Sequence, residues 1–248
     1  MGRAFEFRKA RKMKRWAAMS KAFTRVGKDI SIAVKEGGDN PETNSRLRQI
    51  IQNAKEINMP KENIQRAIKK ASGDDAENYI EITLEGYAAN GVAVFIECTT
   101  DNNNRTVANV RSYFTKYEGS LGKNGSLEFI FERKGVFTIE IHEAPSNIDE
   151  FEMNLIDFGL EDLEKDDEAI TIYCNLNKFS TLQRYFETND IKIQNAETQR
   201  IAKSTKFLKL NESDLVIKLL QILEEDDDVQ NVFHNMKLTE EILNHMQK

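Results

Sequence analysis

Six basic side chains crowd the segment from residue 8 to residue 15, and aromatic residues flank it on both sides. A nucleic acid backbone is a dense line of phosphates, and cations that neutralise several of them release counterions and give a salt-dependent affinity. The rings of Phe5, Phe7 and Trp16 could stack on unpaired bases. The competing interpretation is a solvated helix face whose aromatic residues pack inside the protein. The near absence of acidic residues here favours a polyanion partner, but it does not separate DNA from RNA.

A second candidate contact lies in the body of the chain, where Asp101-Asn102-Asn103-Asn104-Arg105-Thr106 falls between a predicted strand and a predicted helix. In one interpretation this is a polar contact loop in which Arg105 reaches a phosphate. In the other, which the sequence alone favours, it is a turn capped by Asx side chains. Arg105 stands where a calcium-binding loop needs Asp or Asn, so calcium is excluded. The full set of predicted nucleic-acid contacts is Arg3, Arg8, Lys9, Arg11, Lys12, Lys14, Arg15, Lys21, Arg25, Lys28, Lys35 and Arg105.

No constellation of residues indicates catalysis. Only two residues separate Gly119 from Gly122, and Asn124 replaces Ser or Thr, so this glycine-rich segment is not a phosphate-binding loop. The three histidines have no metal-ligand spacing with the cysteines, and no nucleophile motif occurs. The sequence therefore predicts a protein that is not an enzyme and that has no metal, no cofactor and no small-molecule substrate.

Five consecutive acids, Glu224 to Asp228, follow a predicted helix. They could form a site for a cation or a basic partner. A solvated turn is favoured, because consecutive carboxylates do not all point at one ion. The dipole of a helix disfavours acids at its carboxyl end. Something other than helix stability has therefore placed them there.

The charge of the 248-residue chain is unevenly distributed, although its net value is only −6. Residues 1–70 hold 18 basic and 7 acidic residues, a net charge of +11, whereas residues 135–248 hold 11 and 24, a net charge of −13. An acidic body repels nucleic acid, which leaves the basic head as the contact surface. Without a secretory signal or a long apolar run, the chain is expected in the cytoplasm, with its cysteines reduced and no membrane contact.

Short amphipathic helices are the elements that must position the cations of the head. From residue 16 to residue 34 the apolar positions fall on one side of a helical wheel, and the basic positions from Lys21 to Lys35 fall on the other. Gly37-Gly38 ends this helix, and Asn40 is the expected N-cap of the next, with Pro41 in its first turn. Asn58-Met59-Pro60 interrupts, and a third helix stops at Ser72-Gly73. Residues 1–75 therefore read as a small basic helical bundle.

The body alternates less regularly between strands and helices, which favours an α+β fold over a large parallel sheet. Strands are expected at 79–84, 92–98, 127–131, 136–141, 169–174, 191–201 and 229–233, and helices at 105–117, 149–158, 179–187 and 212–223. The last helix and strand can return to the sheet that begins at residue 79. The predicted architecture is thus an α+β domain of residues 76–134 plus 206–248, with a second α+β sandwich of residues 135–205 inserted in it.

Several segments along the whole chain are similar to one family. They are Lys35-Glu-Gly-Gly38, Asn58-Met-Pro-Lys-Glu-Asn-Ile64, Arg66-Ala-Ile-Lys-Lys70, Glu85-Gly-Tyr87, Glu97-Cys-Thr-Thr-Asp-Asn102, Asn104-Arg-Thr106, Phe131-Glu-Arg-Lys-Gly135 and Asp226-Asp-Asp-Val-Gln-Asn231. The chain resembles the YebC/PmpR family, which includes the mitochondrial translational activator of cytochrome c oxidase. The resemblance implies a helical first domain and two α+β domains in a cytoplasmic bacterial regulator of transcription that binds DNA. Many members begin with a Gly-His-Ser-Lys-Trp-like run, whereas this chain has Gly2-Arg-Ala-Phe-Glu-Phe7, so contacts of that opening do not transfer.

Three functions stay open at this point. The first is a DNA-binding regulator of transcription that uses the basic head. The second is a ribosome-associated translation factor whose head contacts ribosomal RNA, since other members of the family are linked to the ribosome and to translation of proline-rich stretches. The third is a protein-interaction adaptor that uses the acids at 224–228 and has no nucleic acid partner.

Overall fold

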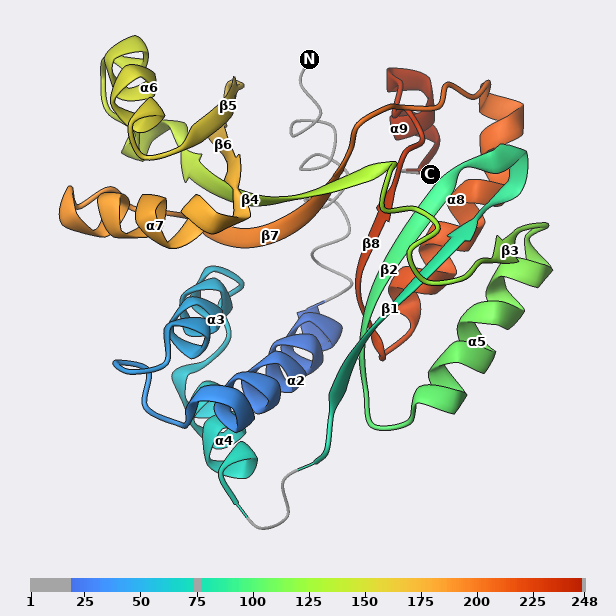
Figure 1. Cartoon of the computed structure of the whole chain (residues 1–248), viewed down its shortest axis with the longest axis horizontal. Coiled ribbons are helices and arrows are strands. Elements are labelled where there is room, and N and C mark those ends of the chain that lie inside the picture. The colour runs from blue at the N-terminus through green and yellow to red at the C-terminus, as the bar shows by residue number, and fades with distance from the viewer. Residues whose placement is uncertain (1–18, 74–76, 247–248) are drawn as a thin grey trace. The chain divides into compact units, whose positions relative to one another are not determined.

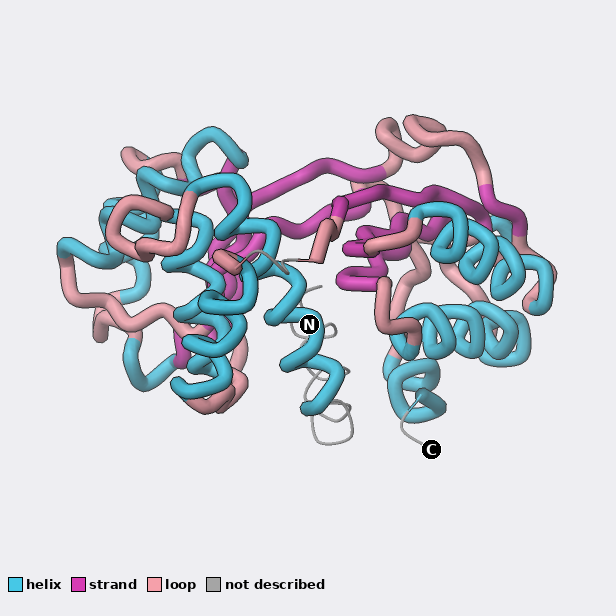
Figure 2. The backbone as a smooth tube through the Cα atoms, turned by 90° about the horizontal axis from the view of Figure 1, so that it is seen from below, coloured by secondary structure: helices cyan, strands magenta, loops and turns pink. Residues whose placement is uncertain are grey.

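A computed structural model describes residues 19–73 and 77–246, with side chains from Lys21 onward (Figure 1). Contacts divide the chain into two compact units. One unit holds Arg133–Ile201, and the other holds the described residues up to Glu132 together with those from Ala202 onward. Each unit combines helices with a four-stranded antiparallel sheet (Figure 2). The α+β architecture with one domain inserted in another, predicted from the sequence, is confirmed.

The head consists of three helices, α2 (Met19–Gly37), α3 (Ser45–Glu56) and α4 (Lys61–Ala71). Helix α2 contacts both of the others. Its buried residues Ile30 and Ala33 pack with Leu47, Ala54 and Ile64 in one apolar cluster. The helix ends as predicted, because Gly38 takes a left-handed conformation with a φ of 82° and its N–H donates to the carbonyl of Val34.

The predicted start of α3 is wrong by four residues. Asn44, not Asn40, is the N-cap, since its side chain accepts a hydrogen bond of 3.0 Å from the N–H of Leu47. Asn40 instead begins a separate turn, in which its side chain accepts from the N–H of Glu42. Both residues have the chemistry of a cap, and the sequence pattern did not distinguish the turn from the helix that follows it.

The sheet of the larger unit has the strand order β3 (Ser120–Leu121), β1 (Ile80–Tyr87), β2 (Ala93–Thr100) and β8 (Val229–His234). Strands β1 and β2 form an antiparallel hairpin from the pair Ile80–Thr100 to the pair Tyr87–Ala93. Strand β8 returns from the far end of the sequence to pair with β2. The predicted return of the chain to its first sheet is therefore confirmed.

Helices α5 (Asn103–Lys116) and α8 (Leu210–Glu225) contact this sheet and each other. Phe114 of α5 lies against Gly86 of β1, where a Cβ would meet its ring at 2.7 Å. Another apolar cluster joins Phe95 and Phe233 of the sheet to Leu127 and Phe131. The sheet thereby brings the start of α5 close to the end of α8, where the polar site described below lies.

The inserted unit has the order β4 (Phe131–Glu140), α6 (Ile148–Ile156), β5 (Leu160–Lys165), β6 (Ala169–Asn175), α7 (Phe179–Thr188) and β7 (Asn195–Ala202). Its strands lie in the order β5-β6-β4-β7. This β-α-β-β-α-β succession is that of a ferredoxin-like domain. Phe137, Ile172, Leu155 and Phe186 form its core between the sheet and the two helices.

One predicted strand is absent, and one predicted boundary lies inside a strand. Residues 124–130 form turns instead of a strand. Strand β4 begins at Phe131 and runs through Gly135, although a break was predicted there. Gly135 belongs in the strand because a Cβ would lie 2.5 Å from the ring of Phe179 and 2.7 Å from the sulfur of Cys174. A glycine in a strand here marks close packing rather than a turn.

The sequence patterns did not predict the short strand β3, the edge strand β5 or the last helix α9 (Glu240–Met246). Strand β5 has the sequence Leu-Glu-Asp-Leu-Glu-Lys, in which charges mask any alternation. Charged edge strands are common because they discourage pairing with another chain. Of the helices in the described parts of the chain, none combines the length and apolar character that crossing a bilayer requires.

Candidate nucleic-acid interface

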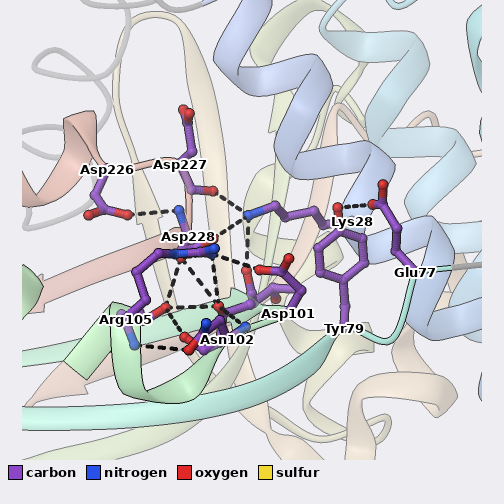
Figure 3. Close-up of polar contacts among 12 residues, drawn as sticks. Lys28, Glu77, Tyr79, Asp101, Asn102, Arg105, Asp226, Asp227 and Asp228 are labelled. Carbon is purple, nitrogen blue, oxygen red and sulfur yellow. Dashed lines mark hydrogen bonds and ion pairs between the residues drawn. The ribbon is translucent and has the colours of Figure 1, made fainter. Parts of the chain in front are cut away.

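Five of the twelve predicted contact residues lie in the part of the chain that the structure describes. Four of these five come together at one place in the larger unit, where α2 meets the acidic segment 224–228. Figure 3 shows two of them, Lys28 and Arg105, beside Asp228. We call Glu224–Asp228 the acidic loop. The remaining seven, which lie outside the described residues, are Arg3, Arg8, Lys9, Arg11, Lys12, Lys14 and Arg15.

Lys28 is the innermost of these cations, with 7% of its surface exposed. Its ammonium donates to the carboxylate of Asp228 at 2.8 Å and to the carbonyls of Asp227 at 2.7 Å and Thr99 at 3.1 Å. A lysine has three N–H donors, so these contacts use all of them. Lys28 was predicted to bind nucleic acid, but its burial and its three internal acceptors leave no donor for a phosphate.

Asp228 receives hydrogen bonds from three side chains besides Lys28. Arg105 donates at 2.7 Å, the hydroxyl of Thr106 at 2.8 Å and that of Thr100 at 3.2 Å. Burial would raise the pKa of this carboxyl, but the hydrogen bonds from Lys28, Arg105 and Thr106 lower it to about 2. Asp228 therefore stays ionised at neutral pH and balances the two cations that face it.

Lys21 and Arg25 donate to backbone oxygens at the end of α8. Lys21 donates to the carbonyl of Glu225, and Arg25 donates to the carbonyl of Glu224. Both carbonyls belong to the last turn of α8, where a helix lacks its own donors and its dipole is negative. The cations of α2 thus compensate the end of α8, which explains how acids are tolerated at a position that the dipole disfavours.

The acidic loop is held in shape by its own hydrogen bonds. The carboxylate of Asp226 accepts from the N–H of Asp228 at 2.8 Å and from the hydroxyl of Tyr113 at 2.9 Å. Burial and the Asp226 carboxylate raise the pKa of Tyr113 to about 12, so this phenol remains a donor. The sequence favoured a solvated turn for these acids. In the structure the loop is the surface on which α2 docks.

Arg105 lies at the start of α5, in the segment for which two interpretations were open. The side chain of Asn102 caps the helix by accepting from the N–H of Arg105 at 3.1 Å. The guanidinium donates to Asp101 and to Asp228, each at 2.7 Å, while 46% of the side chain stays exposed. The capped turn is confirmed, and the guanidinium of Arg105 is directed at the protein's own carboxylates.

Lys35 is separate from this group. Its exposed side chain lies one residue after the buried Val34 and donates to the side chain of Asn78 at 2.9 Å. The structure therefore brings Lys21, Arg25, Lys28 and Arg105 to the acidic loop and leaves Lys35 near the solvent-exposed end of α2.

The three glycines of the segment 119–125 have their backbone donors occupied. Glu85, which is 3% exposed, accepts from the N–H of Gly125 at 2.8 Å and from that of Leu127 at 2.6 Å. These donors point at the protein's own carboxylate, so they are not available to cradle a phosphate. The segment is a turn only from residue 124, because Ser120–Leu121 form the short strand β3, which the interpretation as turns did not include.

The described residues contain no group of three His, Cys, Asp or Glu side chains placed to hold a metal ion. The two cysteines are buried free thiols. Burial raises the pKa of Cys98 to about 12 and that of Cys174 to about 11. A thiol is a nucleophile only as thiolate, so neither cysteine is activated at neutral pH.

The fold and this interface define a class of α+β protein in which a basic helical head docks on an acidic loop of the body. Residues 3–74 match the model of the TACO1/YebC protein N-terminal domain, and residues 79–236 match the model of the TACO1/YebC second and third domain. The chain belongs to the TACO1/YebC family.

Relatives cover the chain almost completely. A probable transcriptional regulatory protein of Flavobacterium psychrophilum is 54% identical and covers 96% of this chain and 100% of its own length. One from Porphyromonas gingivalis is 52% identical over 96% and 98% of the two chains. The crystal structure of a conserved hypothetical protein from Aquifex aeolicus has a TM-score of 0.81 at 40% identity and covers 92% and 93% of the two chains.

Proposed function

We propose that this protein is a cytoplasmic regulator of transcription that binds DNA through its basic N-terminal domain and catalyses no reaction. The observation that carries the proposal is the charge of the head, where residues 1–28 contain 10 basic residues and 1 acidic residue. The names of the relatives, probable transcriptional regulatory proteins, support a role in regulation.

The contacts of α2 narrow the set of residues that this function would use. Lys28 has its donors occupied, and Lys21, Arg25 and Arg105 donate to the body. We therefore assign phosphate contacts first to the seven basic residues from Arg3 to Arg15, and keep Lys35 as a secondary contact. These seven lie in the segment that the sequence marks as richest in cations.

A salt titration tests this function. Binding of the whole protein to a fluorescent DNA duplex is measured by anisotropy from about 50 to about 200 mM salt, where a protein with six to ten phosphate contacts loses about 10³-fold or more in affinity. A variant with the seven N-terminal cations changed to Gln should bind weakly at every salt concentration. A control with Arg111, Lys116 and Lys123 changed to Gln should bind like the wild type. An isotherm that added salt does not weaken would contradict the proposal.

A ribosome-associated translation factor is the second candidate, and one observation favours it. The inserted unit, residues 133–201, holds 15 acidic and 7 basic residues. Such a domain repels nucleic acid but complements a basic protein surface, which a partner made of both RNA and protein would offer. If the protein stays at the top of a sucrose gradient at low salt while ribosomes sediment, this candidate is abandoned.

An adaptor with no nucleic acid partner is the third candidate. Under this hypothesis the variant with seven Gln substitutions would keep its function in cells. The acidic loop, which would be the adaptor site, already binds α2 within the same chain. A partner would therefore have to displace the head, and this makes the adaptor the least supported of the three.

A further inference from the structure

The cations of α3 and α4 divide into two groups, according to whether the described part of the chain offers them an acceptor. Arg46 forms ion pairs with Glu36 and Glu81, Arg48 donates to two backbone carbonyls, and Lys70 pairs with Glu77 at 2.8 Å. Four other cations of these helices are exposed and contact no acceptor among the described residues. They are Lys55, Lys61, Arg66 and Lys69.

Three of these four cations lie on α4. The buried side of the helix carries Ile64, which packs into the core of the head together with its neighbours on the same side. At about 100° per residue, Lys61, Gln65 and Lys69 form one stripe that starts about 60° from Ile64 and reaches about 140° from it, and Arg66 lies about 60° beyond Lys69. All four of these polar side chains are exposed.

Glu62 is an acid on the same face. It belongs to the first turn of α4, where a carboxylate complements the positive end of the helix dipole. The outward side of α4 nevertheless has an excess of cations, and within the described residues these cations, unlike Lys21, Arg25 and Lys28 of α2, form no hydrogen bond to the acidic loop.

The connection between α3 and α4 is a four-residue turn, residues 57–60. Asn58 has a φ of 59°, its N–H donates to Lys55 O, and the N–H of Met59 donates to Ala54 O, each at 2.9 Å. These two bonds form a Schellman motif, which ends α3 sharply, and Pro60 then leads into α4. A helix, a turn of three or four residues and a second helix is the arrangement of helix-turn-helix proteins, whose second helix enters the major groove.

We propose that the outward face of α4 is the surface that docks on duplex DNA, with α4 in the major groove. Lys61 and Lys69, about two turns apart along α4, contact phosphates. Gln65 and Arg66 face the base edges, where an amide pairs with adenine and a guanidinium pairs with guanine. This assignment rests on the proposed DNA-binding function and names a surface for it, distinct from the N-terminal cations.

The test compares whole proteins in the anisotropy assay. The variant K61Q/R66Q/K69Q removes three exposed charges, and the matched control R111Q/K116Q/K123Q removes three exposed charges from the body. The α4 variant should bind the DNA duplex at least about tenfold more weakly. Its salt slope should also fall by about 0.9 for each phosphate contact that is lost. The control should change neither quantity. Because the six side chains are exposed, circular dichroism melts should show that both variants stay folded.

The outcomes separate this assignment from the function on which it rests. If the wild type shows no salt-dependent binding to duplex DNA, the proposed function fails. If the wild type binds and the α4 variant binds equally well, the function stands and the α4 surface is wrong. Equal losses in variant and control would also overturn the assignment, because they would reflect net charge alone.

A duplex RNA of the same length provides the last comparison. The major groove of A-form RNA is too deep and narrow for side chains to read. The wild type should therefore bind DNA more tightly than RNA, and the α4 variant should lose most of that preference. If the wild type prefers the RNA and the variant loses affinity for both equally, docking in a major groove is excluded.

Discussion

The ammonium of Lys28 lies 2.8 Å from the carboxylate of Asp228, and only 8% of either side chain is exposed. The two residues are 200 positions apart in the chain. Their contact joins the first described helix of the head to the loop after α8, and Arg105 shares the same carboxylate from the start of α5. One carboxylate thus connects three elements, α2, α5 and the acidic loop.

Asp228→Ala should therefore loosen the docking of α2. It leaves the Lys28 ammonium buried beside two carbonyls and without a counter-charge, a change that typically costs about 3–5 kcal/mol. Hydrogen–deuterium exchange should speed up in α2 and in the 224–228 loop, while the amides of residues 133–201 serve as an internal reference. Asp227→Asn is the control, because Asp227 contributes its carbonyl to Lys28 and its side chain is exposed. Equal protection in the two variants would show that the carboxylate has no role in docking.

Protonation of the same carboxylate should lower the free energy of unfolding at acidic pH. The folded pKa of Asp228 is about 2, below its ordinary value of 3.8, so its contribution is fully present above about pH 4 and is lost as the pH falls towards 2. A difference of this size corresponds to about 2 kcal/mol. In urea titrations from pH 6 to pH 2, the gap in stability between the wild type and Asp228→Asn should narrow by about that amount. A gap that stays constant with pH would contradict the lowered pKa.

Asp29 should have the opposite pH dependence. Burial and the nearby carboxylates of Glu81 and Glu97 raise its pKa to about 7, against the opposing effect of Arg46 and Arg25. The folded protein therefore favours the protonated acid. This contribution is present below about pH 4 and is lost as the pH rises through 7.

At high pH the folded wild type must ionise the buried carboxyl of Asp29, which costs free energy. Asp29→Asn has no carboxyl to ionise and avoids this cost. The variant should be more stable than the wild type by about 4 kcal/mol at pH 8 and nearly equal to it at pH 4. The measurement is the urea midpoint across this pH range. Glu42→Gln, at an exposed carboxylate of the head, provides the control and should follow the wild type at every pH. A variant that gains nothing between pH 4 and pH 8 would show that Asp29 ionises normally.

The turn between α3 and α4 should tolerate glycine better than alanine at position 58. Asn58 has a φ of 59°, and a residue with a Cβ pays roughly 1–2 kcal/mol in this left-handed region unless its side chain compensates. Asn58→Ala should lower the free energy of unfolding by about 1 kcal/mol, and Asn58→Gly should leave it almost unchanged. Thermal melts of the two variants measure the difference, and an alanine variant as stable as the glycine variant would refute it.

Two glycines should respond in opposite ways to alanine. At Gly135 a Cβ would lie 2.5 Å from Phe179 and 2.7 Å from Cys174, whereas at Gly27 no atom lies within 4 Å. Gly135→Ala should destabilise the inserted domain by about 1–3 kcal/mol through overpacking. Gly27→Ala should stabilise α2 by roughly 0.5–1 kcal/mol, because alanine favours a helix. Calorimetry on the two variants tests both signs.

Most of the local elements of this protein could be predicted from its sequence alone. Sequence signals gave the ends of α2 and α4 nearly to the residue, and strand-like runs predicted β1, β2 and β8, including the return of β8 to the first sheet. Periodicity succeeds here because each of these elements has one apolar face, which is a property of neighbouring residues. It failed at Leu127, whose turn is held by hydrogen bonds to Glu85, a residue 42 positions away.

Which cations face solvent was decided only by the tertiary structure. A count of charges treats Lys28 and Lys69 alike, since both lie on the polar side of an amphipathic helix. The fold brings Asp228 to Lys28 from 200 residues away, whereas Lys69 remains exposed. The availability of a cation depends on which acceptors the fold brings within about 3 Å of it. Those acceptors come from distant parts of the chain, and no local pattern records them.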